Sequence, residues 1–423
     1  MRILFVTWDG PQVNYLESLF LPIFAGLKPH GYHFDVLQFR WGTRAQANAI
    51  AALCAASGIG YRAANIGRWG GNVGPLVTAV LGGRQVRGAI RDFGSDVVMP
   101  RSVLPSLTML AGRADRLRPV LLDADGLELD ERVEFGGMAS TGLAYRLLRD
   151  VEAQMVRRAR GVITRTQPTV DVLVARAGPP VTSAMFTTVA NGRDGRLFHP
   201  LDPRGRAAAR AEIGIADDVP LIVYAGSVGA RYRTKAIGEF ALALRRLRPD
   251  TQLLVLTGSH EIATRELIEP LPELASFTTL RRVPPDVVPR FLAAADVGTA
   301  LIRPSFSTRG ILPVKTGEYL LCGVPVFGTA AVGDNAAAIQ AGVFLDEEHG
   351  PDGAAAWVVR DVLPQREEMR QRARAVGALH FSLERSIEDY RRALERLAGL
   401  LSGPDSPGNI PSHTPPGTPA SRA

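Results

Sequence analysis

The stretch SFSTRGILPVKTGEYLLCGVPVFGTAAVGD, residues 305–334, contains a short helical pattern between two apolar runs. The runs before and after it, 297–302 and 324–328, have the length and apolarity of strands that are buried on both faces. Pro313 is suited to open the helix and Gly323 to end it. The same alternation of strand and helix occurs along most of the chain, which predicts parallel sheets covered by helices on both faces.

Lys315 and Glu318 lie three residues apart in this helix and therefore share one face of its first turn. A helix start offers unpaired N–H groups and a positive dipole end to an anion, and a lysine there would complete a seat for a diphosphate. A glutamate one turn deeper can accept hydrogen bonds from ribose hydroxyls. Of the 49 basic residues only Lys28, Lys235 and Lys315 are lysines, which favours a use for this compact charge. The alternative is an ordinary helix with a solvated Lys–Glu pair.

The pattern P-x-K-x-x-E-Y-L-x-x-G-x-P-V, followed by Gly333 and Asp334, resembles the donor-site segment of GT-B glycosyltransferases, in particular the retaining enzymes of family 4. In that family the lysine holds the donor phosphate and the glutamate holds the nucleotide ribose, which implies these roles for Lys315 and Glu318. The resemblance also implies an α/β fold of two Rossmann-like parallel-sheet domains facing across a cleft. A nucleotide-sugar would be the co-substrate, with no metal and no other cofactor. Many members carry E-x7-E, but Gly310 stands at the first glutamate position.

Length and composition limit the number of domains, the cellular compartment and the kinds of partner that we expect. A chain of 423 residues exceeds one ordinary core, so we expect two domains. No apolar run is long enough to span a membrane, and the chain begins directly with a strand, so we expect neither a signal peptide nor an anchor. Cys54 and Cys322 lack metal-site spacing and suit a reducing cytoplasm. The net charge of +7 favours an acidic or membrane-surface partner, at the inner face of the membrane, over nucleic acid.

The first half contains candidate reaction-centre residues at expected strand ends. A strand over 2–8 leads to the turn Asp9-Gly10-Pro11, a strand over 96–99 leads to Arg101, and one over 119–122 leads to Asp125. Ligands of parallel sheets bind beyond the carboxyl ends of the strands. We therefore expect catalytic roles for Asp9, Arg101 and Asp125, and a donor contact at Gly10. Neither a G-x-G-x-x-G fingerprint nor a P-loop is present, so a dinucleotide oxidoreductase is a distant possibility.

The acidic segment DADGLELDERVE, residues 123–134, has three interpretations. Its D-A-D could be a metal-binding D-x-D, although the surrounding pattern favours a fold that commonly works without a metal. The segment also resembles D-x-x-G-x-x-x-D-E-R, found in some family 4 members that build surface polysaccharides. The third interpretation is an acidic loop whose charges are hydrated.

The string VANGRDGRLFHP, residues 189–200, resembles the crossing between the two domains of family 4 enzymes. We therefore expect an acceptor-side domain over 1–195 and a nucleotide-sugar-binding domain over 196–380. A helix over 381–401 would pack back on the first domain. Residues 402–423 contain six prolines and cannot bury a core, which predicts a disordered tail.

The second half contains further candidate donor contacts. Gly226 and Ser227 form a small-residue turn that lets the backbone approach a phosphate. Family 4 places an arginine and a lysine where Ser227 and Tyr232 stand here, so Arg231 or Lys235 would substitute for them; a hydrated basic helix start is the alternative. Gly258 follows the strand over 251–257. Val283, in the segment RRVPP, lies in a loop resembling the one that recognises the nucleotide base.

These observations favour a glycosyltransferase that moves a sugar from a nucleotide-sugar to a hydroxyl of a saccharide or lipid-linked saccharide. It would act with retention, without a metal, in polysaccharide or glycolipid assembly. One alternative is a nucleotide-sugar 2-epimerase of the same fold, which needs no acceptor. Another is a non-catalytic nucleotide-sugar-binding scaffold.

Overall fold

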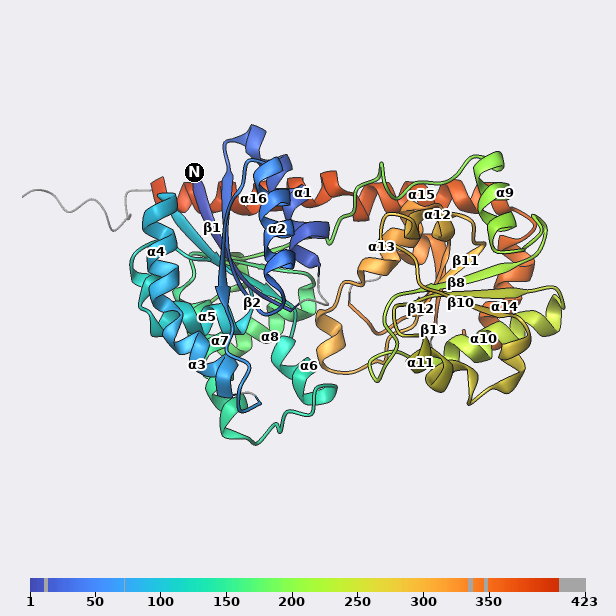
Figure 1. Ribbon diagram of the computed structural model, residues 1–423, viewed down its shortest axis with the longest axis horizontal. Coiled ribbons are helices and arrows are strands. Elements are labelled where there is room, and N and C mark those ends of the chain that lie inside the picture. Colours follow the sequence, from blue (N-terminus) through green and yellow to red (C-terminus); the bar gives the residue numbers. More distant parts are fainter. Residues whose placement is uncertain (11–13, 72, 334–337, 346–348, 403–423) are drawn as a thin grey trace, which may run out of the picture.

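The structure is a computed structural model that describes residues 1–402 except 11–13, 72, 334–337 and 346–348. It contains two α/β domains side by side, each built on a parallel sheet (Figure 1). Pro11, Asp334 and nearly all of the expected tail lie outside the described residues.

Parallel strands form the centre of the amino-terminal domain. β1 (Arg2–Asp9), β2 (His33–Arg40), β3 (Gly60–Asn65) and β4 (Val97–Pro100) are ordered β3-β2-β1-β4. β5 (Leu121–Asp125), β6 (Gly161–Thr164) and β7 (Phe186–Thr188) continue beside β4 through single bridges such as the one between Val98 and Val120. Side chains 3–6 of β1 are wholly buried, as a strand covered by helices on both faces requires.

The covering helices of this domain are α1 (Leu21–Leu27), α2 (Arg44–Ala56), α3 (Val73–Leu81), α4 (Gly83–Phe93), α5 (Val103–Ala111), α6 (Glu128–Glu134), α7 (Leu143–Arg158) and α8 (Gln167–Ala177). α6 corrects one of the interpretations of the acidic segment 123–134, because its second half is a helix with paired charges and not a hydrated loop. Asp130, for example, accepts two hydrogen bonds from Arg176 at 2.8 Å each.

The carboxy-terminal domain has the strand order β10-β9-β8-β11-β12-β13. Its strands are β8 (Leu221–Ala225), β9 (Gln252–Leu256), β10 (Thr278–Arg281), β11 (Val297–Ala300), β12 (Val326–Thr329) and β13 (Gly342–Leu345). Its helices are α9 (Pro203–Glu212), α10 (Thr234–Leu247), α11 (His260–Ala263), α12 (Val288–Ala293), α13 (Val314–Leu321), α14 (Pro351–Trp357) and α15 (Arg366–Phe381).

α13 is the helix expected in the stretch 305–334. Pro313 is its N-cap residue, and Gly323 follows the C-cap with φ +73°, a conformation that glycine adopts without strain. The last described helix, α16 (Leu383–Ser402), runs back across the molecule to the amino-terminal domain (Figure 1). There it buries Tyr390, Leu394 and Leu397 in one hydrophobic cluster with α1.

Both sheets reverse their strand order at a central point, between β1 and β4 in one and between β8 and β11 in the other. Parallel α/β sheets bind ligands beyond the carboxyl ends of the strands at such points. The residues that follow these four strands lie around one cleft between the domains.

Candidate active site

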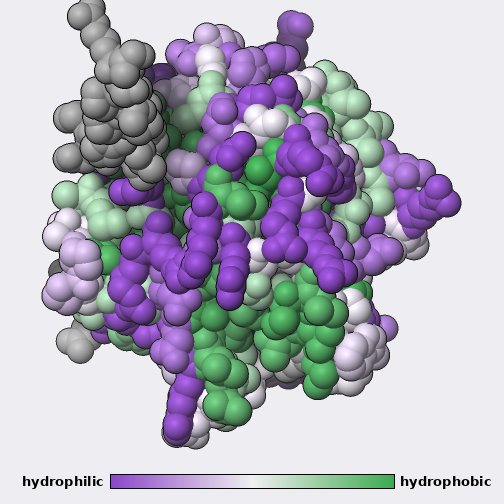
Figure 2. Space-filling view, turned by 90° about the vertical axis from the view of Figure 1, so that its left-hand side faces the viewer, coloured by the Kyte–Doolittle hydropathy of each residue, from purple (hydrophilic) through white to green (hydrophobic). Residues whose placement is uncertain are grey.

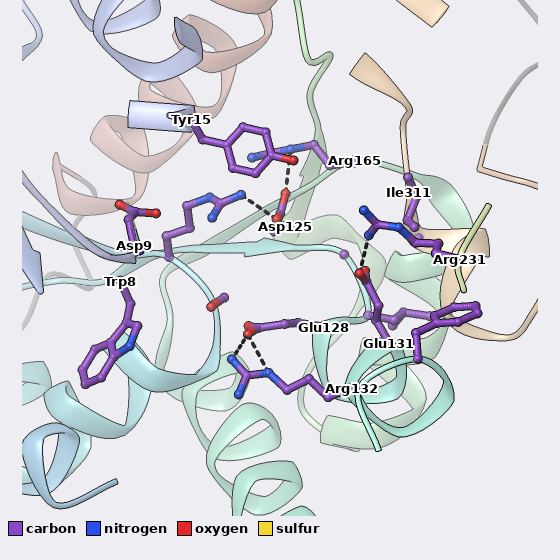
Figure 3. Close-up of a pocket in the computed structure, with 18 of the residues that line it drawn as sticks. Trp8, Asp9, Tyr15, Asp125, Glu128, Glu131, Arg132, Arg165, Arg231 and Ile311 are labelled. Atoms are coloured by element: carbon purple, nitrogen blue, oxygen red, sulfur yellow. Dashed lines mark hydrogen bonds and ion pairs between the residues drawn. The ribbon is translucent and has the colours of Figure 1, made fainter. Parts of the chain in front are cut away.

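A cleft of about 850 Å³ lies between the two domains (Figure 3). The residues that line it come from the carboxyl ends of strands in both sheets and from α6 and α13. They include Asp9, Gly10, Arg101, Asp125, Glu131 and Arg165 from the amino-terminal domain, and Arg231, Tyr232, Gly310, Pro313 and Lys315 from the carboxy-terminal domain.

The Lys315 ammonium is the buried cation of the carboxy-terminal wall. Its Nζ is buried without a hydrogen-bond partner and lies 4.3 Å from the ring centroids of both Tyr224 and Tyr232. Two aromatic faces stabilise a cation but supply no hydrogen-bond acceptor. A Cβ at Gly226 would lie 3.3 Å from Nζ, and Gly226 has φ +126°, so glycine allows the β8 turn to approach the lysine closely. The arrangement leaves a positive charge free to bind an anion.

The pKa of Lys315 also indicates that this side chain is suited to bind an anion. Burial first, and the charge of Arg231 second, lower the pKa of Lys315 to about 7, against the opposing effect of Glu318. A bound phosphate would restore the pKa, because it supplies the negative charge that the buried ammonium lacks.

Arg231 lines the cleft beside Lys315, whereas Lys235 does not. The Arg231 guanidinium forms an ion pair with Glu131 of α6, across the domain boundary (Figure 3). Lys235 has 71% of its side chain exposed and pairs with Glu239 on α10. The sequence predicted Arg231 or Lys235 as a phosphate-binding cation, and of the two only Arg231 lines the cleft.

Glu318 lies behind Lys315 and is not among the residues that line the cleft. Its Oε1 is 2.9 Å from Nε of Arg193, which belongs to the segment that crosses between the domains. Burial raises the pKa of Glu318 although Arg193 and Lys315 both lower it. Its role toward a ribose remains a prediction, and in this structure the carboxylate is paired with Arg193.

Asp125 lies at the end of β5 in the left-handed region, with φ +59°. Arg101 Nη2 donates to its Oδ2 at 2.6 Å, and Arg165 Nε is 3.3 Å from its Oδ1 (Figure 3). Burial raises the pKa of Asp125, but the two guanidiniums together hold it below its ordinary value. Arg165 also binds the fully buried Asp123 at 3.0 Å, so both carboxylates of the D-A-D sequence are paired with arginines.

Sequence reasoning missed Arg165. It follows β6 directly, and the rule that placed Arg101 and Asp125 at strand ends would have selected it as well. Its Nη1 is buried without a hydrogen-bond partner, as is Nε of Arg101 on the same wall, although both guanidiniums form ion pairs.

Asp9, the last residue of β1, and Gly10 after it line the cleft, as the strand-end argument expected. Asp9 is buried and accepts hydrogen bonds from Thr7 Oγ1 at 2.9 Å and Gln38 Nε2 at 3.0 Å, which are neutral donors. A Cβ at Gly10 would lie 2.2 Å from the ring of Trp41, so only glycine fits there.

Helix α6 connects the two walls. Glu134 accepts hydrogen bonds from the backbone N–H groups of Phe306 at 3.0 Å and Ser307 at 3.1 Å, in the turn that precedes α13. Together with the pairing of Glu131 and Arg231, this holds the segment resembling D-x-x-G-x-x-x-D-E-R against the carboxy-terminal domain.

Gly310, where many family 4 enzymes carry a glutamate, contacts the same region. A Cβ there would lie 2.8 Å from Thr169 Oγ1 and 3.0 Å from the Leu127 backbone nitrogen. A Cβ at Gly126 would in turn lie 2.8 Å from the Gly310 carbonyl oxygen. The two glycines allow the domains to meet backbone to backbone, and a longer side chain at position 310 does not fit this arrangement.

The remaining candidates lie on carboxyl-end loops outside the lining of the cleft. Ser227 adjoins Gly226, and its carbonyl accepts a hydrogen bond from Tyr224. Gly258 is exposed after β9, and Val283 packs at the edge of the domain core after β10. Among the described residues no three His, Cys, Asp or Glu side chains are grouped so that they could hold a metal ion. Metal independence remains a prediction.

The comparisons with known proteins agree with this geometry. Residues 219–360 match the family model described as Glycosyl transferases group 1. The D-inositol 3-phosphate glycosyltransferase of Geodermatophilus obscurus is 29% identical over 265 residues, which cover 58% of this chain. The match spans 56% of that protein, a little over half its length.

Solved structures show the fold of the whole chain. Anabaena HepE in complex with UDP-glucose has a TM-score of 0.67 and 18% identity, with 94% of this chain and 100% of that chain covered. The UDP-GlcNAc 2-epimerase from Neisseria meningitidis bound to UDP-GlcNAc has a TM-score of 0.56 and 11% identity, with 94% and 100% covered. The expected GT-B fold is confirmed.

Proposed function

We propose that this protein is a glycosyltransferase that moves a sugar from a nucleotide-sugar to an acceptor hydroxyl. The observation that carries the proposal is the buried Lys315 ammonium, which faces an interdomain cleft without a hydrogen-bond partner beside the Gly226 turn. A nucleotide-sugar would place its diphosphate there. The names of similar proteins support this donor class, since HepE was solved with UDP-glucose.

The reaction breaks the bond between the sugar and the diphosphate and forms one to the acceptor oxygen. The departing diphosphate develops negative charge, which Lys315 and Arg231 would stabilise from fixed positions. The diphosphate would compete with Glu131 for the Arg231 guanidinium. Both cations lie in the carboxy-terminal domain, so we assign the donor to 196–380 and the acceptor to 1–195.

On the acceptor wall, Asp9 is a carboxylate held only by neutral donors, and it could accept a proton or a hydrogen bond from the acceptor hydroxyl. Arg101 and Arg165 hold Asp125 at the same rim, where it would orient the sugar or the acceptor. Closure of the cleft by α6 would exclude water and so limit hydrolysis of the donor.

We further propose that the sugar is transferred with retention, without a metal, in the assembly of a polysaccharide or glycolipid. The support is the resemblance of 305–334 to retaining family 4 enzymes and of 123–134 to members that build surface polysaccharides. Proton NMR of the product would test retention, because the anomeric configuration of the transferred sugar must equal that of the donor. Activity that survives a chelator would support metal independence.

A thermal-shift screen against nucleoside diphosphates and their sugars tests the donor class, since a ligand that binds the folded state raises its stability by mass action. The nucleotide-sugar identified in this way is then incubated with and without a membrane extract. Transfer that requires the extract supports the proposal. Conversion of the donor alone into an isomer would indicate a 2-epimerase, and tight binding without turnover would indicate a scaffold.

A further inference from the structure

Helix α3 presents an apolar face to solvent at the end of the amino-terminal domain. Val73, Leu76, Val80 and Leu81 are between 37% and 67% exposed, and Trp69 just before the helix is 57% exposed. Positions 73, 76 and 80 repeat at intervals of three and four, which places them on one side of α3. Figure 2 shows apolar side chains gathered in the lower part of this end of the molecule, bordered by hydrophilic ones.

The surroundings of α3 are basic. Residues 66–91 contain no Asp or Glu but four arginines, Arg68, Arg84, Arg87 and Arg91, the last of which pairs with Asp92 at 3.1 Å. Two of them, Arg84 and Arg87 at the start of α4, line a hollow of about 410 Å³ together with Val80 and Leu81 of the apolar face. Apolar contact and positive charge are thus offered within one small site.

We infer that this surface, the α3 face of Trp69, Val73, Leu76, Val80, Leu81, Arg84 and Arg87, docks on an anionic lipid bilayer. A helix with large apolar residues on one side and arginines at its edge lies in the plane of a membrane interface. Tryptophan is favoured at the same depth, because its ring is apolar and its N–H remains near water. The groove takes an acidic headgroup against the guanidiniums, while the apolar side chains contact the acyl boundary.

Charge decides between a bilayer and a second copy of this chain. A two-fold dimer through the α3 face would place Arg84 and Arg87 of one copy near those of the other, because such an interface pairs the same patch with itself. No acidic residue in 66–91 offsets that repulsion. An anionic bilayer supplies the opposite charge, and each arginine near such a surface strengthens binding.

The α3 face also adjoins the cleft. Arg68 and Pro75 line the cleft, and Arg68 stacks on Trp41 with its guanidinium carbon 4.8 Å from the ring centroid. Docking would therefore bring the acceptor side of the cleft to the membrane. The consequence that the acceptor is lipid-linked rests on the proposed function, whereas docking itself does not.

Vesicle cosedimentation of the full chain, without nucleotide, tests the inference. We expect binding to vesicles of phosphatidylcholine with phosphatidylglycerol, at least about tenfold stronger than to phosphatidylcholine alone, and weakened by salt. Equal binding to both kinds of vesicle, or none to either, would overturn the inference. Because no donor or acceptor is present, failure here leaves the proposed transfer activity unaffected.

Two variants locate the surface. The double variant Val80→Gln and Leu81→Gln, and the double variant Arg84→Gln and Arg87→Gln, should each reduce binding by at least about tenfold. The matched control is Leu247→Gln with Leu379→Gln, which changes two apolar residues that are 51% and 63% exposed on the other domain. Binding that falls equally in the control would contradict the inference. So would light scattering that shows a lipid-independent dimer abolished by the Val80 and Leu81 changes.

Discussion

Replacing Lys315 by methionine should stabilise the fold while it removes donor binding. Methionine has a similar length and fills the space between Tyr224 and Tyr232 without a charge. The pKa of Lys315 falls from 10.5 to about 7, and each pH unit corresponds to about 1.36 kcal/mol. The buried ammonium therefore costs up to about 5 kcal/mol, a bound that relaxation around the site would reduce.

The size of this effect depends on pH. Below pH 7 the lysine is protonated in both the folded and the unfolded state, so the wild type bears the full cost. Between pH 7 and 10.5 the unfolded state binds more protons, so the stability of the wild type rises with pH. The advantage of Lys315→Met should therefore be largest near pH 6.5 and should shrink by roughly 3 kcal/mol by pH 9.5.

Denaturant unfolding at these two pH values measures the difference, and calorimetry with a nucleotide-sugar measures donor binding. Lys235→Met is the matched control, because it removes a lysine of the same domain that is exposed and paired with Glu239. We expect the control to change neither quantity appreciably. The reasoning would be refuted if the difference in free energy of unfolding between Lys315→Met and the wild type were the same at both pH values. Normal donor binding by the variant would refute it as well.

Further predictions concern the same cleft. Nucleotide-sugar binding by the wild type should weaken in calorimetry as pH rises above 7, because neutral Lys315 has no charge for the diphosphate; a flat profile to pH 9 would contradict this. Glu131→Gln should tighten donor binding about threefold by releasing Arg231, and weaker binding would show that the pair helps the donor site. Gly310→Ala should lower the free energy of unfolding by about 1–3 kcal/mol in denaturant, whereas an unchanged midpoint would mean that the domains can separate there without cost. Asp9→Asn should reduce turnover at least about 100-fold with donor affinity unchanged, and near-normal turnover would exclude a role as base.

Local sequence patterns predict most of the secondary structure because each depends on few neighbouring residues. The apolar run at 221–225 is β8, and the segment around Lys315 is α13 with Pro313 at its cap. β3 (Gly60–Asn65) was not identified, because its side chains are only partly buried at the sheet edge and carry no alternation of apolar and polar residues. The alternation of strands and helices also predicts where the cleft lies, since strand ends meet there.

Pairings between distant residues were not predictable in the same way. Arg193 was a residue of the domain crossing, and nothing in its surroundings indicates that it contacts Glu318, 125 positions away in the chain. Arg165 pairs with Asp123 and Asp125 only because β5 and β6 are neighbouring strands, whose pairing shifts register between these two aspartates. The choice of Arg231 over Lys235 likewise depends on how the turn after β8 meets α6.

The distribution of charge in the cleft distinguishes Asp9 and Lys315 from the other charged residues that line it. Among the described carboxylates that line it, Asp125 is paired with Arg101 and Arg165, Glu128 with Arg132, and Glu131 with Arg231.

Asp9 has no ion pair within the described parts of the chain, and the Lys315 ammonium has no hydrogen-bond partner there. Asp9 ends β1 of the amino-terminal sheet and Lys315 lies on α13 of the carboxy-terminal domain, so these opposite charges belong to opposite walls. Sugar transfer requires an acceptor hydroxyl that loses a proton and a phosphate that gains charge. In the proposed reaction, a carboxylate and an ammonium without partners of opposite charge on facing domains would supply these two functions, which an ion pair within one wall could not.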